Sequence, residues 1–151
     1  MLSRRSVVSN LKKHIEMFLK DNMQLLINAY PDISYSDIAF SYDPSEYELS
    51  LSFNTVFDRN KAVLIYKDVN EDMVIKNPKY WRNQYIAFLD VIDQEHYQEY
   101  FSSNITDLYD VIVLELYKFM NSHIYKALKK DTDFEVSFVV SEPFEHFKLN
   151  A

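Results

Sequence analysis

Carboxylates, histidines and tyrosines are the side chains in this sequence whose types and spacing could do chemistry. Glu142, Glu145 and His146 lie close together near the end of the chain, and carboxylate and imidazole groups are common metal ligands. Pro143 interrupts any helical spacing among the three residues, and their order matches no metal-binding motif. The sequence therefore predicts no metal ion at this cluster.

Paired carboxylates are a second possible source of chemistry, because two such groups can act as acid and base. Glu46 and Glu48 would share a solvent-exposed face of a strand, and nothing around them predicts the burial that separates two pKa values. The chain has neither Cys nor Gly, which excludes thiol catalysis and glycine-rich phosphate loops. We predict no enzyme and no cofactor. The alternative is a small enzyme or ligand-binding protein with a pocket between sheet and helices.

Acidic residues are concentrated in two windows that contain no Lys or Arg. Residues 21–58 and 83–117 hold 14 of the 23 acidic residues and nine of the 12 tyrosines. Tyrosine is enriched in protein interfaces, and carboxylates steer a basic partner toward its binding surface. A net charge of −7 argues against nucleic acid or an anionic membrane as the partner. The windows therefore predict a surface that binds a basic protein.

The predicted binding residues fall into two short segments, the turn of a predicted hairpin and a predicted helix over 93–100. Within the helix, residues 93, 97 and 100 share one face, while residues 95 and 99 are like-charged neighbours that repel weakly. The predicted partner-binding residues are Asp93, Glu95, Tyr97, Glu99, Tyr100, Asp43, Glu46 and Glu48. The competing interpretation is a solvated acidic helix face that binds nothing.

A single domain over residues 1–151 must position these side chains. Apolar residues recurring every three or four positions predict helices over 4–29, 83–101 and 105–130. Residues 67–79 are polar and are predicted to form a loop. Together with the strands described next, the pattern predicts an α+β fold: a small, largely antiparallel sheet with three long helices packed on it.

Alternating apolar and polar residues predict the strands. A β-hairpin is expected from strands over 38–43 and 47–54, and a final strand over 134–140. Residues 62–66 are rich in β-branched residues and favour a third, central strand. A short helix over 58–66 is the alternative, because periodicity does not decide a short apolar run.

The only tryptophan, Trp81, and the ends of the chain complete the sequence evidence. Trp81 fits an interface anchor or, as we favour, a core residue held in place by the turn at Asn77-Pro78. The N-terminus lacks an apolar stretch of signal-peptide length, and no apolar run approaches the roughly 18 residues of a membrane helix. We therefore expect a cytoplasmic protein.

The order of these elements resembles small acidic bacterial immunity proteins encoded beside polymorphic or contact-dependent toxins. The resemblance consists of an N-terminal helix, a hairpin ending at 52–55, Asn77-Pro78 before Trp81, long helices and a C-terminal strand. It spans most of the chain but supplies no active-site residues. It implies a single-domain cytoplasmic inhibitor that binds one toxin domain. Together with the acidic windows, it predicts an immunity protein that occludes the basic active site of a cognate toxin, such as a nuclease. A structural or adaptor subunit that forms a symmetric dimer is a further alternative.

Overall fold

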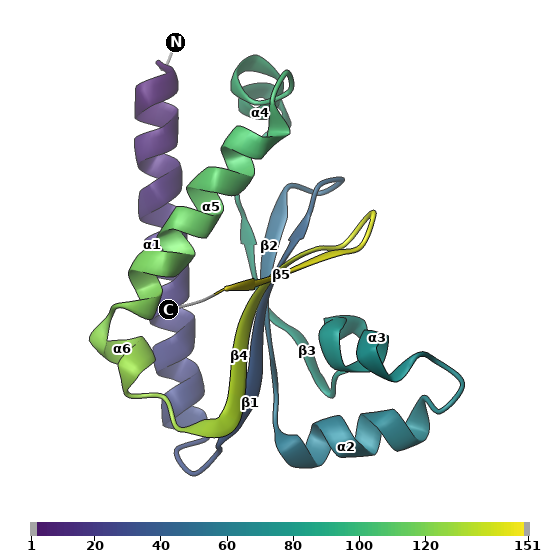
Figure 1. Cartoon of the computed structure of the whole chain (residues 1–151). Coiled ribbons are helices and arrows are strands. Elements are labelled where there is room, and N and C mark those ends of the chain that lie inside the picture. Colours follow the sequence, from purple (N-terminus) through teal and green to yellow (C-terminus); the bar gives the residue numbers. More distant parts are fainter. Residues whose placement is uncertain (1–2, 150–151) are drawn as a thin grey trace.

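The computed structural model describes residues 3–149, which form one five-stranded sheet and several helices (Figure 1). The strands are β1 (Tyr35–Asp43), β2 (Glu48–Asn54), β3 (Asn83–Asp90), β4 (Lys130–Val140) and β5 (Glu145–Leu149). The helices are α1 (Arg4–Ala29), α2 (Val56–Ile65), α3 (Glu71–Lys76), the 3-10 helix η1 (Pro78–Tyr80), α4 (Gln94–Tyr100), α5 (Ile105–Met120) and α6 (His123–Lys126). The strand order is β3-β2-β1-β4-β5, and only the β1–β4 pair is parallel within the described residues. The α+β class and the largely antiparallel sheet are confirmed, although the described chain has six α-helices rather than three.

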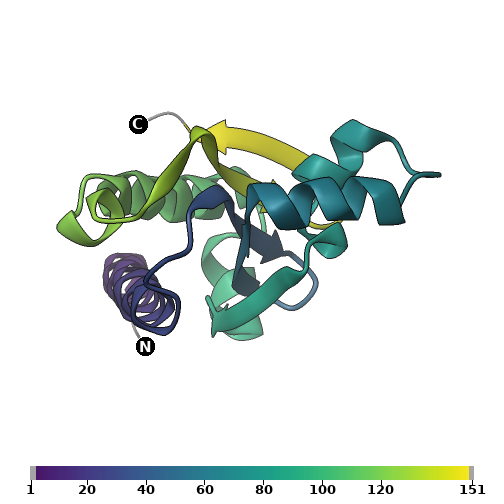
Figure 2. The same ribbon diagram turned by 90° about the horizontal axis from the view of Figure 1, so that it is seen from below.

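Helices cover both faces of the sheet (Figures 1 and 2). On one face α1 and α5 pack against each other and against the strands. The sheet contributes apolar side chains from alternate positions to this core, namely Ile38, Phe40, Tyr42, Leu49, Leu51, Phe53, Val136, Phe138 and Val140. Because side chains alternate across a strand, the intervening residues lie on the opposite face, which is polar.

The polar face is covered in part by the segment from α2 to η1. Trp81 is 2% exposed and packs with Ala39 and Val139 in a small second cluster. Its indole Nε1 donates hydrogen bonds to the carbonyl oxygens of Val74 and Ile75, at 3.2 and 3.1 Å. The interpretation of Trp81 as a core residue is therefore confirmed, and its ring holds α3 against the sheet.

The N-terminal helix and the first hairpin form as the sequence predicts. The helix α1 covers the predicted range, and the Ser3 side chain caps it by accepting a hydrogen bond from the Ser6 backbone N–H. Strands β1 and β2 pair antiparallel from Asp37 with Asn54 to Asp43 with Glu48. Strong periodicity over long segments explains both results.

The predicted helix over 83–101 is wrong. Residues 83–90 form the edge strand β3, whose side chains alternate between half-buried and exposed, and only 94–100 are helical, as α4. Asp93 caps this short helix at its N-terminus. The apolar residues of 83–101 fit both the helical spacing of three to four residues and the strand spacing of two. Pairing with β2 favours the strand.

The predicted central strand over 62–66 is also wrong, and the alternative helix is correct. The helix α2 begins after Thr55, whose side chain accepts a hydrogen bond from the Asp58 backbone N–H at 3.1 Å. Strand β1, between β2 and β4, takes the central position. The predicted loop over 67–79 contains α3 and most of η1, which Asn70 and Asn77 cap.

The C-terminal third contains a break and a strand that periodicity did not reveal. The predicted helix over 105–130 ends at Met120, and Ser122 caps a separate short helix, α6. The predicted last strand is confirmed within the longer β4, and β5 pairs with it antiparallel. Of the helices described in 3–149, none combines the length and apolar character needed to cross a membrane.

Candidate functional site

The turn between β1 and β2 is held rigidly by its own side chains. The Asp43 Oδ1 atom accepts hydrogen bonds from the backbone N–H and the hydroxyl of Ser45, at 2.9 and 2.7 Å. Tyr47 takes a left-handed conformation, with φ of 53°. Its carbonyl oxygen accepts a hydrogen bond of 2.8 Å from the Val91 backbone N–H. This bond ties the turn to the segment that leads from β3 into α4.

The helix α4 carries the other predicted segment and is stabilised at its N-terminus. Asp93 accepts hydrogen bonds from the backbone N–H of His96 at 2.8 Å and contacts the His96 Nδ1 atom at 2.6 Å. These two contacts lower the pKa of Asp93, and the side-chain contact raises the pKa of His96. Glu95 and Glu99 follow one helical turn apart, and both are exposed to solvent. The helix therefore presents carboxylates outward.

The structure brings the two predicted segments together at one end of the sheet. The rings of Tyr47 and Tyr97 lie 4.6 Å apart between centroids, and Glu48 is paired with Asp90 across β2 and β3. Figure 1 shows the β1–β2 turn and α4 at the same end of the molecule. We call this region the acidic end and define it by Asp43, Glu46, Glu48, Asp90, Asp93, Glu95 and Glu99. Glu95 and Glu99 lie on the face of α4 away from Tyr97 and the hairpin.

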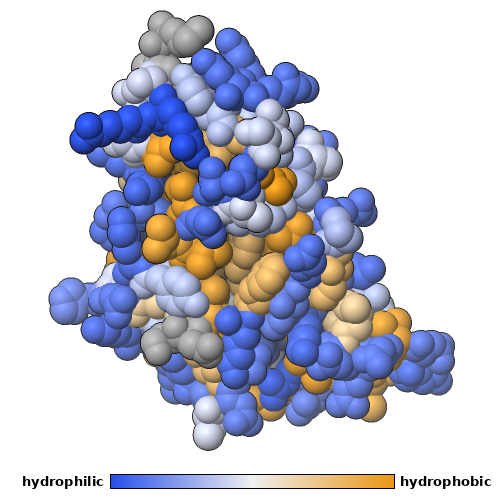
Figure 3. Space-filling view, turned by 45° about the horizontal axis from the view of Figure 1, so that its top comes forward, coloured by the Kyte–Doolittle hydropathy of each residue, from blue (hydrophilic) through white to orange (hydrophobic). Residues whose placement is uncertain are grey.

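Like charges are crowded around Glu48 at the acidic end. Partial burial raises the pKa of Glu48, and the neighbouring carboxylates of Asp90, Asp43 and Glu46 raise it further. Within residues 3–149, no Lys or Arg forms an ion pair with any carboxylate of the acidic end. In Figure 3 a hydrophobic area crosses the middle of the face that is shown, and hydrophilic side chains surround it. A positively charged surface placed at the acidic end would relieve the repulsion.

The tyrosine rings at the acidic end are packed against other side chains more than they are exposed on the surface. Tyr42 is fully buried and contacts the ring of Tyr109 at 5.6 Å between centroids, and burial raises its pKa. Tyr97 is half-buried against Tyr47, and Tyr100 lies parallel to the ring of His96 at 6.4 Å. The carboxylates rather than the phenol groups therefore dominate the exposed surface.

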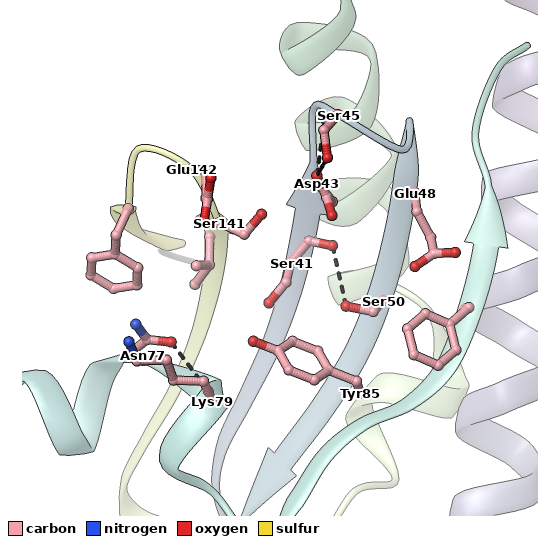
Figure 4. Close-up of a pocket in the computed structure, with 13 residues that line it drawn as sticks. Ser41, Asp43, Ser45, Glu48, Ser50, Asn77, Lys79, Tyr85, Ser141 and Glu142 are labelled. Atoms are coloured by element: carbon pink, nitrogen blue, oxygen red, sulfur yellow. Dashed lines mark hydrogen bonds between the residues drawn. The ribbon is translucent and has the colours of Figure 1, made fainter. Parts of the chain in front are cut away.

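A groove of about 490 Å³ adjoins the acidic end on the polar face of the sheet (Figure 4). Strands β1 and β2 form its floor, and β3, the segment 77–79 and the β4–β5 turn surround it. Its polar lining consists of Ser41, Asp43, Ser45, Glu48, Ser50, Asn77, Lys79, Tyr85, Ser141 and Glu142. Phe88, Val139 and Phe144 add apolar surface. The predicted residues Asp43 and Glu48 thus belong both to the acidic end and to the groove.

The cluster near the C-terminus does not assemble as a metal site. Glu142 lies in the β4–β5 turn, while Glu145 and His146 begin β5. Among the described residues, no group of three or more potential ligand side chains is close enough to hold a metal ion. Burial lowers the pKa of His146, which favours the neutral imidazole.

Sequence reasoning missed the groove because its lining comes from distant parts of the chain. The sequence predicts a loop around Asn77 and Lys79 and a helix around Tyr85. One signal was present: the polar positions of the hairpin, Ser41 and Ser50, alternate with its apolar residues. Those serines predicted a second face but not that other elements would partly enclose it.

Comparisons of the chain with protein-family models, with curated proteins and with solved structures found no match. The geometry of the acidic end and of the groove therefore provides the basis for assigning a function.

Proposed function

We propose that the chain is an immunity protein that binds the basic domain of a cognate toxin through its acidic end. It occludes the active site of that domain in the cytoplasm and performs no catalysis itself. The observation that carries this proposal is the convergence of two acidic segments, from different parts of the sequence, at one end of the sheet. The contacts of Tyr47 with Tyr97 and Val91 hold the two segments together.

Physical arguments favour a basic protein as the partner. Neighbouring carboxylates that form no ion pair with Lys or Arg repel one another, and an oppositely charged surface relieves that repulsion on binding. A nuclease domain must carry positive charge to hold phosphate groups, so a carboxylate surface competes with its substrate. The rigid turn and the capped helix limit the conformational entropy that binding would remove.

Charge reversal tests the proposal directly. The chain is co-expressed with candidate basic toxin domains, beginning with any that the neighbouring genes encode, and survival and association kinetics are measured. We expect Glu95→Lys with Glu99→Lys to slow association at least tenfold, because long-range steering depends on the net charge of the surface. The matched control is Asp21→Lys with Asp32→Lys, which makes the same charge change at exposed positions outside the acidic end. It should alter the rate less than about twofold.

Salt provides a second measurement on the same complexes. The association rate of the unmodified chain should fall steeply with ionic strength, and that of the Glu95→Lys, Glu99→Lys chain should fall less. If reversal at Glu95 and Glu99, and separately at Asp43 and Glu46, leaves both rate and affinity unchanged, the acidic end is not the interface and the proposal is wrong.

A further inference from the structure

A buried hydroxyl on the floor of the groove lacks a hydrogen-bond partner. Ser41 is 4% exposed, and its Oγ atom has no partner among the described residues. Figure 4 shows this hydroxyl on the groove side of β1, directed toward the same space as the hydroxyl of Tyr85. A buried polar group without a partner costs stability, and such groups are rare in folded proteins. Its position on a groove floor indicates a ligand that would satisfy it.

Tyr85 is directed into the same groove by a strained backbone. The register between β2 and β3 shifts between Leu51 and Phe53, and within this bulge Tyr85 has φ of 49°. Its backbone N–H leaves the strand ladder and donates to the Ser52 Oγ atom at 2.8 Å. Bulges and left-handed non-glycine residues concentrate at functional sites, where they redirect side chains. Burial and the charge of Asp43 raise the pKa of Tyr85, so its hydroxyl keeps its proton.

The charges around the groove favour an extended organic cation. The carboxylates of Asp43, Glu48 and Glu142 come from separate elements, and the described residues provide no grouping that would hold a metal ion. The only base in the lining, Lys79, places its Nζ atom over the ring of Tyr80, 5.0 Å from the centroid. Three carboxylates against one ammonium group leave the groove with a net negative charge.

Aromatic rings add a second type of recognition at the sides of the groove. Phe88 belongs to β3 and is 57% exposed, while Phe144 belongs to the turn between β4 and β5. The strand order places these two elements on opposite sides of β2 and β1. Cations bind favourably over aromatic faces, and a planar guanidinium also stacks on them.

We propose that this groove binds an alkylguanidinium group, the chemistry of an arginine side chain. A guanidinium carries five N–H donors and no acceptor, which matches a site made of carboxylates and hydroxyl oxygens. Asp43 and Glu142 would pair with its charge, and the hydroxyls of Ser41 and Tyr85 would accept its remaining N–H groups. The volume of about 490 Å³ lies within the range of roughly 300–1,000 Å³ typical of small-ligand sites.

Two sources could supply this group, a free guanidino compound or an arginine of the basic partner. Only the second source rests on the proposed function. The groove and the outer face of α4 share no residue, because Glu95 and Glu99 do not line the groove. The two surfaces can therefore be tested separately.

The first experiment titrates the isotope-labelled full chain with agmatine, N-acetyl-arginine amide and N-acetyl-citrulline amide, followed by NMR. Citrulline is nearly isosteric with arginine but uncharged. We expect both guanidinium compounds to shift the backbone signals of 41–50, 77–79, 85–88 and 139–144. The citrulline compound should bind at least tenfold more weakly, and N-acetyl-lysine amide more weakly than its arginine counterpart.

Variants then locate the binding groups. Glu142→Gln and Asp43→Asn should each weaken agmatine binding about three- to tenfold, and Ser41→Ala should weaken it about twofold or more. Asp32→Asn, which removes the same charge at an exposed position outside the groove and the acidic end, should leave the affinity unchanged. Absence of signal shifts with both guanidinium compounds, equal binding of citrulline, or equal loss with Asp32→Asn would each overturn the proposal.

The partner complex distinguishes the two sources and separates this inference from the proposed function. Loss of toxin affinity with Glu142→Gln would identify an arginine of the partner as the occupant. If agmatine binds but Glu142→Gln leaves toxin binding intact, the site belongs to a free guanidino ligand. If toxin binding depends on Glu95 and Glu99 while agmatine fails to bind, this inference is wrong and the proposed function stands.

Discussion

The two faces of the sheet use alternate residues of the same strands but differ sharply in composition. Along β1, Phe40 faces the core under α1 and α5, while its neighbours Ala39 and Ser41 face the other side. Both faces are buried along most of β1, so burial alone does not separate them. The two faces differ in whether their buried side chains are apolar or polar.

The polar face retains side chains that weaken a core. Its buried polar residues include Asp37, Ser41, Ser50, Ser52, Asn54 and Ser137. Ser41 Oγ and Asn54 Nδ2 have no hydrogen-bond partner among the described residues, and the Tyr35 and Tyr42 hydroxyls in the apolar core have none either. Apolar side chains of similar size would stabilise the fold more. The comparison indicates that the apolar face supplies most of the stability, whereas the polar face carries the groove for which we propose a ligand.

The largest expected difference in stability is between substitutions at two adjacent residues of β1, one on each face of the sheet. Phe40→Ala should destabilise the chain by roughly 3–5 kcal/mol, because it removes a ring from a close-packed core and leaves a cavity. Ser41→Ala should leave the stability unchanged or raise it by up to about 1 kcal/mol, since it removes a buried hydroxyl that has no partner. Urea denaturation of both variants measures the two values.

A greater loss of stability from Ser41→Ala than from Phe40→Ala would contradict the view that the apolar face supplies most of the stability. A loss above about 1 kcal/mol in Ser41→Ala would mean that the hydroxyl makes a stabilising contact, and the groove floor would then be structural. Ser50→Ala provides a matched variant, because Ser50 Oγ does have a partner, the Ser41 carbonyl oxygen at 3.4 Å.

An intermediate effect is expected at Trp81, the main apolar side chain of the polar face. Trp81→Phe keeps most of the ring but removes the N–H that bonds the carbonyl oxygens of Val74 and Ile75. The free energy of unfolding should fall by roughly 1–3 kcal/mol, because the change leaves buried acceptors unpaired and a small cavity. Hydrogen exchange should show faster opening of α3 than of α1. Equal acceleration in both helices would mean that the polar face is not a separate unit of stability.

The comparison also explains which parts of the fold the sequence could predict. The helix α1 and the β1–β2 hairpin carry long, unambiguous periods, and both form where expected. The segment 83–101 mixes apolar residues at both spacings, and only its pairing with β2 decides that β3 is a strand. The helical conformation of residues 62–66 follows from the Thr55 cap at the start of α2 rather than from their β-branched content.

The candidate site could likewise be predicted from the sequence only in part. Charge counting alone found both halves of the acidic end, because Lys and Arg are absent from those windows. Their proximity depends on Tyr47 and Val91, a long-range contact that no local pattern encodes. The groove was harder to predict than the acidic end, because the Tyr85 side chain reaches it through a register shift between β2 and β3. Local patterns predicted which residues are polar, and tertiary pairing decided which of them meet.

A smaller effect than at Phe40 or Trp81 is expected from Asp37, a buried carboxyl on the polar face. Burial raises its pKa above the ordinary value of 3.8, although the Ser36 hydroxyl and Arg59 partly offset the shift. The folded chain therefore holds this proton more tightly than the unfolded chain, and the stability contributed by Asp37 falls as pH rises from 3.8 through the raised pKa. Asp37→Asn removes the ionisation but keeps an acceptor for Ser36. At pH 7 the variant should be more stable by up to about 1 kcal/mol, because the unmodified chain must bury the charged form.

This advantage should shrink as the pH is lowered through the raised pKa, since the unmodified carboxyl then becomes neutral too. Urea denaturation of both chains across this pH range measures the difference. Arg59 contacts the Asp37 carboxylate at 3.8 Å, and Arg59→Gln should raise the pKa of Asp37 further by removing the compensating charge. An Asp37→Asn chain that is less stable at pH 7 than at pH 4, relative to the unmodified chain, would show that the ion pair outweighs desolvation. The polar face would then owe part of its stability to charge, and the division of roles between the two faces would be less sharp than their compositions indicate.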